Sequence, residues 1–172
     1  MPVTINGSAG VTTNSGAVYN GIQSGTAVTA SGTSVDFTSI PSWVKRVTVM
    51  FNAVSTNGTS HKLVQIGSGS IQTTGYVSSS VITSSTVANS GNITSGMALY
   101  TSNATSSAIV HMIFTNISSN IWVESHVGLS DAATSVQGGG VVTLSGTLDR
   151  IRITTVNGTD TFDAGSINIM YE

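Results

Sequence analysis

The chain has 172 residues, which fits one domain with a sizeable hydrophobic core. Charged residues make up only 7% of it, against about a quarter in typical soluble domains, and the net charge is −2. Five basic residues scattered along the chain cannot form a phosphate-binding stripe, so we expect no nucleic-acid partner. Cysteine is absent, which excludes disulfides and thiolate metal sites.

Ser and Thr supply about a third of the chain, and Val and Ile are abundant, whereas strong helix formers are scarce. Val, Ile and Thr are stiff at χ1 and fit a pleated surface, so this composition favours strands. The first four residues lack the basic and apolar regions of a signal peptide, and we expect none. No apolar run approaches the roughly twenty residues that span a bilayer, so we expect no membrane insertion.

Residues 1–33 differ from the rest of the chain. Glycines interrupt them every few positions, and their apolar residues never form a sustained run. This pattern is too apolar for a solvated linker and too interrupted for a core element. It predicts an extended N-terminal arm over residues 1–33, which docks on a neighbouring subunit or another surface, before a domain over residues 34–172. The alternative is a first pair of strands belonging to that same domain.

The first half of the domain shows clear strand patterns. Residues 35–38 predict a strand, and Ile40 to Trp43 predict a turn. Residues 44–54 alternate between apolar and polar positions, which is typical of a strand with one buried face. Asn57-Gly58 predicts a hairpin, with residues 61–66 as the return strand. Residues 67–96 are rich in Ser and Thr and predict one or two short strands joined by long loops.

The second half begins with a dense apolar run. Residues 108–115 carry apolar side chains on both faces, which predicts a central strand covered on both sides. Residues 116–120 predict a turn, and residues 121–127 alternate again, with Ile121, Val123 and Val127 opposite Trp122, Glu124 and His126. Residues 130–140 predict a loop ending in three glycines, and residues 141–144 a short strand.

Two further strands close the chain, at residues 148–155 and 167–171, with the turn pair Asn157-Gly158 between them. In the first of them, Ile151 and Ile153 are expected to point inward, and Arg150 and Arg152 outward. About eight short strands separated by turns predict an all-β fold, a jelly-roll-like antiparallel β-sandwich. The sequence also fits an immunoglobulin-like sandwich.

Residues 34–52, SVDFTSIPSWVKRVTVMFN, and the following STNGTS at 55–60 resemble a module of tailed-bacteriophage tail fibres and other small virion structural proteins. TTGY at 73–76 and GSINIMYE at 165–172 resemble it too, so that the resemblance covers roughly residues 26–172. It implies a β-sandwich and often a homotrimer. In that family the module usually follows a shaft and an attachment domain, whereas about 30 residues precede it here.

The chemistry-bearing residues form no recognisable catalytic motif. Glu124 and His126 share one strand face and could form an acid–base pair or a metal site, but we favour a polar outer face. His111 lies in an apolar strand and is expected to be a hydrogen-bonded core or interface residue. The histidine spacing does not fit a metal site, and no Gly-x-Ser-x-Gly elbow is present. We therefore expect no enzyme, no metal and no cofactor.

Four large aromatic residues could stack on a sugar or anchor a protein interface. Together with the strand pair they make the set of candidate interface or ligand contacts: Trp43, Tyr76, Tyr100, Trp122, Glu124 and His126. Burial of the aromatic residues in the core or in a subunit contact is the competing interpretation.

These observations lead to an expected function. We expect a virion structural protein on the exterior of a phage particle, synthesised in the host cytoplasm and assembling with copies of itself. Its partners are expected to be other virion proteins and a host-surface glycan or protein, which its long polar loops would contact. The alternative is a capsid decoration or head-fibre protein that its N-terminal arm docks on the shell.

Overall fold

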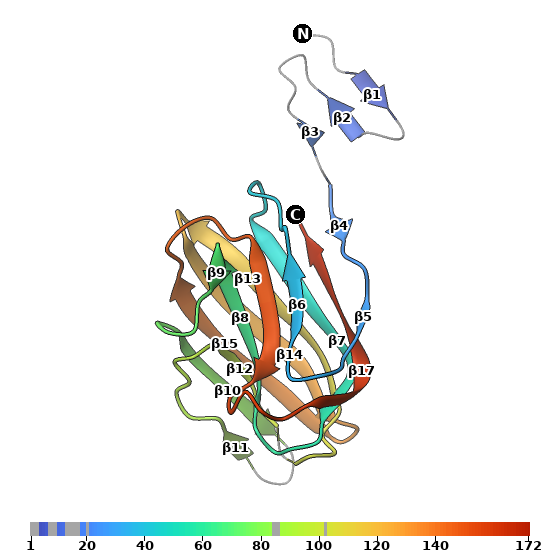
Figure 1. The fold of residues 1–172 in the computed structure, drawn as a ribbon, viewed down its shortest axis with the longest axis vertical. Helices are drawn as coiled ribbons and strands as arrows, with labels where there is room; N and C mark the ends of the chain where they lie inside the picture. Colours follow the sequence, from blue (N-terminus) through green and yellow to red (C-terminus); the bar gives the residue numbers. More distant parts are fainter. Residues whose placement is uncertain (1–3, 7–9, 13–17, 20, 84–86, 102) are drawn as a thin grey trace.

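The computed structural model describes residues 4–6, 10–12, 18–19, 21–83, 87–101 and 103–172. These residues form strands and loops and no helix, so the described part of the chain contains no helix that could cross a membrane. Two antiparallel sheets pack face to face as a sandwich (Figure 1). The structure thus confirms the predicted all-β antiparallel sandwich.

The larger sheet has nine strands in the order β11-β10-β15-β14-β13-β7-β17-β4, and β5 also pairs with β17. The smaller sheet has the order β12-β8-β16-β6, with β9 paired to β8. A separate three-stranded sheet, β1-β2-β3, precedes them. The bounds are β1 (Thr4–Asn6), β2 (Gly10–Thr12), β3 (Val18–Tyr19), β4 (Gln23–Ser24), β5 (Val28–Thr29), β6 (Val35–Thr38), β7 (Arg46–Thr56), β8 (Lys62–Ser68), β9 (Ser70–Ile71), β10 (Val77–Thr83), β11 (Val87–Asn89), β12 (Met97–Leu99), β13 (Ala108–Ser118), β14 (Ile121–Asp131), β15 (Thr134–Thr143), β16 (Arg150–Thr155) and β17 (Phe162–Tyr171).

The core lies between the two sheets and follows the alternation of the strands. Val47, Val49 and Phe51 of β7 are buried there, and so are Ile151 and Ile153 of β16. On β7 the alternation shifts after Phe51, because Ala53 adopts a left-handed φ of 54° and the next buried residue is Val54. The pairing of β7 with both of its neighbours shifts register in this region, as expected for a β-bulge.

The predicted hairpin at Asn57-Gly58 is wrong. A strand does follow at Lys62, but β7 belongs to the larger sheet and β8 to the smaller one, so the connection crosses the end of the sandwich. The loop is held by residues far along the chain, because Asn57 N donates to Thr161 O at 2.9 Å and Ser60 N to Asp160 Oδ2 at 3.0 Å. These bonds take the place of the short-range pairing that a hairpin would make.

The loop predicted at residues 130–140 is also wrong. Strand β15 runs through the three glycines, and a tight turn after Asp131 joins it to β14. A Cβ on Gly138 would lie 2.5 Å from His126 Cε1, and one on Gly140 would lie 2.6 Å from Met97 Sδ. Glycine is therefore needed in this strand for close packing, a use that the sequence pattern does not separate from a flexible loop.

Part of the predicted N-terminal arm lies on the sandwich of its own chain. Strands β4 and β5 pair with β17, and Ala30 N donates to Gly165 O at 3.0 Å. Ala30 is buried in the core. The sheet β1-β2-β3 stands apart from the sandwich (Figure 1). The rest of the arm, residues 1–3, 7–9, 13–17 and 20, lies outside the described residues.

Tyr76 joins the start of β10 to the smaller sheet. Its hydroxyl lies 2.9 Å from Ile66 N, which donates to it, and donates in turn to Ile66 O or Gln72 O, at 3.0 and 3.1 Å. The ring is buried, and burial raises the pKa of this phenol to about 12. The hydroxyl thus satisfies buried backbone groups of β8 and of the loop after it.

We expect Tyr76→Phe to lower the free energy of unfolding by about 1–3 kcal/mol, because it leaves the buried Ile66 N–H without its acceptor. Chemical denaturation followed by tryptophan fluorescence measures this loss. Tyr171→Phe, at a partly exposed tyrosine, is the matched control and should change stability by less than about 0.5 kcal/mol. Equal losses in the two variants would contradict this role of the Tyr76 hydroxyl.

Candidate functional site

A row of three polar side chains crosses the inner face of the larger sheet. Ser80 Oγ of β10 lies 2.9 Å from His126 Nε2, and His126 Nδ1 lies 2.9 Å from Glu124 Oε1, both on β14. Strand β15 runs between β10 and β14, and both Ser80 and His126 are paired with Gly138. Because Gly138 has no side chain, serine and imidazole meet above it. We call these residues the Ser80–His126–Glu124 row.

The row is buried. The exposed fraction is 1% for Ser80, 2% for Glu124 and 5% for His126. The interpretation of Glu124 and His126 as a polar outer face is therefore wrong, although the alternation along β14 was predicted correctly. Which of the two alternating sets of side chains points inward depends on which face of the strand packs on the smaller sheet. Trp122 points the same way and is 3% exposed, so it belongs to the core and is not an exposed interface residue.

Burial governs the electrostatics of the row. Loss of solvation raises the pKa of the Glu124 carboxyl, and the hydrogen bond and charge of His126 act in the opposite direction. Within the described part of the chain, Glu124 Oε2 has no hydrogen-bond partner. The row thus places a carboxyl group in a medium that favours its neutral form.

The order serine, histidine, carboxylate is that of acyl-transfer hydrolases. A nucleophile must, however, have room for a reacting atom about 3 Å away, and Ser80 Oγ is enclosed in the core. This oxygen also accepts a hydrogen bond from Tyr100 N at 3.2 Å. In this conformation the row has the connectivity of a catalytic triad without substrate access.

Ser80 also connects the two sheets along one side of the sandwich. Ser78 Oγ accepts from Ala98 N at 2.8 Å, and Ser80 Oγ accepts from Tyr100 N, so two serines of β10 bind the free edge of β12. Strand β10 belongs to the larger sheet and β12 to the smaller one. The two hydroxyls therefore satisfy backbone N–H groups that no neighbouring strand pairs with, and they hold the sheets together.

We expect Ser80→Ala to lower the free energy of unfolding by about 1–3 kcal/mol, because Tyr100 N–H and the His126 ring both lose a buried partner. Ser79→Ala is the matched control, since Ser79 is the next residue on the same strand and points to solvent. Urea denaturation of both variants measures the difference. A Ser80→Ala protein as stable as Ser79→Ala would show that the row contributes nothing to folding.

Lys62 is a second buried ionisable group. It is 1% exposed, and its Nζ donates to Ser106 O at 3.2 Å and to Thr101 Oγ1 at 3.4 Å. Thr101 N in turn donates to His61 Nδ1 at 3.0 Å. Burial lowers the pKa of Lys62 to about 8, with Asp163 acting in the opposite direction. Its neutral partners only partly replace the lost water, so the cation is costly to the fold.

The lowered pKa of Lys62 predicts that the free energy of unfolding depends on pH. Between the folded pKa of about 8 and the usual 10.5, the unfolded chain holds a proton that the folded chain has released, so stability rises with pH across this window. The expected gain from pH 7 to pH 10 is about 2.5 kcal/mol in the free energy of unfolding. Lys62→Met should remove it, whereas Lys45→Met, at an exposed lysine, should retain it. An unchanged slope in Lys62→Met would contradict the assignment.

The six candidate contact residues do not form one site. Tyr76 and Trp122 are buried, and of the six only Glu124 and His126 are hydrogen-bonded to each other. Trp43 packs on Tyr171 with ring centroids 5.9 Å apart, and Tyr100 on His61 at 4.5 Å. Sequence analysis missed Ser80, because one serine in a run of three carries no pattern of its own. His111 is exposed, so within the single chain it is not a core residue.

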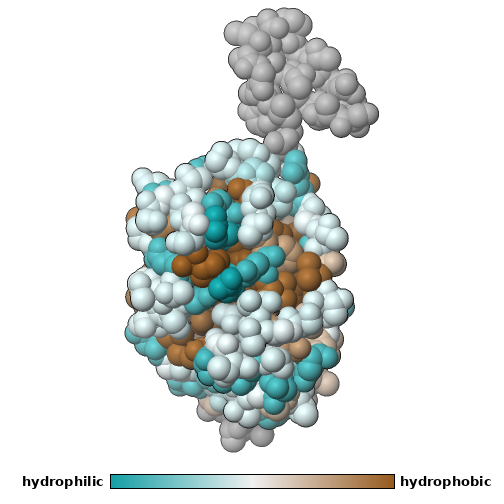
Figure 2. Space-filling view, in the orientation of Figure 1, coloured by the Kyte–Doolittle hydropathy of each residue, from teal (hydrophilic) through white to brown (hydrophobic). Residues whose placement is uncertain are grey.

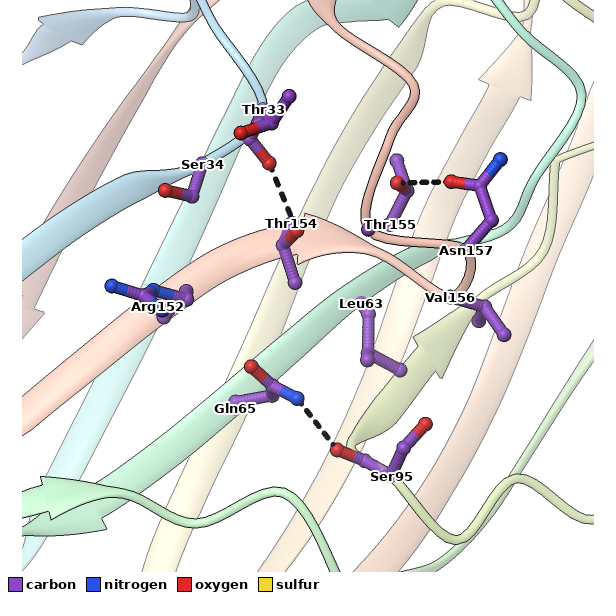
Figure 3. Close-up of a pocket in the computed structure, with 11 residues that line it drawn as sticks. Thr33, Ser34, Leu63, Gln65, Ser95, Arg152, Thr154, Thr155, Val156 and Asn157 are labelled. Carbon is purple, nitrogen blue, oxygen red and sulfur yellow. Dashed lines mark hydrogen bonds between the residues drawn. The ribbon is translucent and has the colours of Figure 1, made fainter.

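A groove of about 290 Å³ crosses the outer face of the smaller sheet (Figure 3). Leu63 and Val156 line it together with Gln65, whose Nε2 donates to Ser95 O at 2.8 Å. At its side Arg152 makes two hydrogen bonds to Asp36, at 2.8 and 2.7 Å. Figure 2 shows hydrophilic residues lying across a hydrophobic area on this side of the molecule. Polar residues such as Ser34, Ser95 and Thr154 make up much of the rest of its lining. Among the described residues no three potential metal ligands gather.

The opposite surface of the sandwich is apolar. On the outer face of the larger sheet, hydrophobic side chains of β10, β13, β14 and β15 are 37–67% exposed: Val77, Ile109, Ile113, Ile117, Val123, Val127, Leu129 and Val141. We call this surface the outer apolar face. Strand β13 was predicted to be covered on both sides, but among the residues that the structure describes only its inner side is covered.

Comparison with known proteins provides no relative. No protein-family model, curated protein or solved structure matches the chain. The functional argument therefore rests on the geometry described above.

Proposed function

We propose that the chain is a non-enzymatic structural module of a bacteriophage particle, which assembles with copies of itself and takes part in attachment to the host surface. The observation that supports this proposal is the contrast between its interior and its exterior. The triad-like chemistry of the Ser80–His126–Glu124 row is enclosed, whereas the exterior carries a broad apolar face. An exposed apolar surface of this kind is typical of a protein that binds other proteins.

Composition is consistent with the same role. A chain with 7% charged residues has few surface ions to be screened, so its contacts should depend little on salt. The polar loops and the groove of the smaller sheet lie on other parts of the surface and stay accessible when the outer apolar face is covered. They are where we propose that a host glycan or surface protein is contacted.

The second candidate function is capsid decoration, with the first residues of the chain holding the protein to the shell. The observation that favours it is the sheet β1-β2-β3, which stands apart from the sandwich (Figure 1). The strands of both sandwich sheets begin only at β4, so this segment is not needed to complete them. A segment of this kind is suited to docking on another protein.

Removing residues 1–20 separates the two candidates, because every strand of the sandwich is retained. For a tail-fibre module we expect the shortened protein still to compete with phage adsorption, and antibody labelling to mark the fibres of intact particles. For a decoration protein the shortened form should no longer bind purified heads, and the label should cover the capsid. Labelling on neither structure, with no binding to particles, would contradict the proposed function.

A further inference from the structure

We propose that the outer apolar face of the larger sheet is the surface through which this chain binds a second copy of itself. This inference rests on the proposed function and deepens it, since it names the contact surface and the partner.

Strand β13 has the composition of a strand buried on both sides. Its inward residues are Val110, Met112 and Phe114, and all three are at most 1% exposed. Its outward residues include Ile109 and Ile113, which are 49% and 39% exposed although they are as apolar as the inward ones. With Ile117, three of the five outward residues of β13 are thus isoleucine and two are polar, His111 and Thr115, whereas the outer face of an antiparallel sheet that faces water is usually polar. Within the described residues no second layer lies here, so the missing cover is expected from another chain.

The register of the sheet makes the exposed apolar residues contiguous. Thr115 of β13 pairs with Val123 of β14, which pairs with Val141 of β15, which pairs with Val77 of β10. The apolar part of this row, Val123, Val141 and Val77, therefore crosses three strands and ends beside Thr115 on the fourth. Neighbouring outward positions on β13 and β14 add Ile113 and Val127 beside it. Side chains paired directly across strands lie about 5 Å apart, so these residues form a continuous surface.

The charge of the face indicates what covers it. From Val77 to Thr83 on β10, Ile109 to Ile117 on β13, Ile121 to Leu129 on β14 and Ser135 to Thr143 on β15, no outward residue is Asp, Glu, Lys or Arg. A partner with a charged surface would have to bury those charges without counterions, which is costly. A second copy presents the same face, on which His111 is the one ionisable outward residue of these ranges, and so brings no Asp, Glu, Lys or Arg charge to be buried.

The shape of the face is suited to the same partner. A shallow hollow of about 890 Å³ lies over β10, β15 and residues 89–92, where the outward position Gly139 provides no side chain. Beside it the side chains of β13 and β14 project, with Val127 67% exposed. A surface that carries a ridge next to a hollow can receive its own ridge in its own hollow when two copies are related by rotation.

The area is sufficient for a stable contact. Eleven residues of β13 span about 36 Å and four strands about 19 Å, which gives a flat face of roughly 700 Å² before side-chain relief. A standard protein–protein interface covers about 800 Å² on each partner. The outer apolar face therefore has the dimensions of one subunit's share of an ordinary interface.

The test is the mass of the full chain in solution, measured by light scattering and sedimentation over about 1–100 µM protein. We expect wild type to be a dimer or a larger closed oligomer. Val127→Asp should raise its dissociation constant about a hundredfold or more, because it buries a charge at the centre of the contact. Val127 is largely exposed in the single chain, so the variant should keep its circular dichroism spectrum, and its unfolding midpoint should fall only by the stabilisation that the subunit contact provides.

Two matched variants complete the test. Val156→Asp places the same charge on a valine that is 40% exposed in the turn after β16 and should leave the mass unchanged. Because the chain has no cysteine, Ser125→Cys introduces a single thiol on the outer apolar face. This thiol should react with a maleimide at least tenfold more slowly in the oligomer than in a Val127→Asp background.

A wild-type monomer throughout this range would overturn the inference, and so would equal effects of Val127→Asp and Val156→Asp. If wild type is a monomer and Val127→Asp abolishes its incorporation into particles, the face binds another virion protein, so the inference fails and the proposed place in the particle stands without self-assembly. If Val127→Asp dissociates an oligomer that is found on no particle, the proposed function fails and the inference stands.

Discussion

The contact between the two sheets is the constraint on which the rest of the structure depends. It excludes water from every inward side chain, so each inward polar group needs a partner within the protein. Tyr76 meets this need through the backbone of Ile66, and Ser80 through His126 and Tyr100. Lys62 meets it only in part, and its pKa is lowered as a result. The buried hydrogen bonds thus connect the two sheets and, unlike non-directional apolar packing, fix specific residues of one sheet against the other.

The same constraint explains why a row with the connectivity of a catalytic triad is better understood as part of the framework. Catalysis requires a hydroxyl that a substrate can reach, whereas Ser80 Oγ is occupied by an N–H from the opposite sheet. Two serines of β10 bind the edge of β12 in this way and close one side of the sandwich. Residue type and hydrogen bonds are therefore insufficient evidence of an active site, because a substrate must also be able to reach the hydroxyl.

The function that we propose is therefore carried by the outer surfaces of the domain. The larger sheet carries many apolar side chains on both of its faces, and among the described residues the smaller sheet covers only the inner one. The other surfaces are polar and carry few charges. A domain with one bare apolar face and one polar groove on the opposite side can assemble through the first and make further contacts through the second. This division supports the proposal of an assembling structural module.

The sequence by itself determined the all-β class, most strand positions and the alternation along β7, β14 and β16, because period-two patterning is a local property. Tertiary structure alone decided which side of β14 points inward, since Val123 and Trp122 are both apolar and either face could have been the core. It also decided that the three glycines lie in a strand and that Asn57-Gly58 crosses between sheets. The reason is that the contacts responsible are distant in sequence. The His126 ring leaves no room for a side chain at Gly138, and hydrogen bonds to Asp160 and Thr161 hold the loop at residues 57–60.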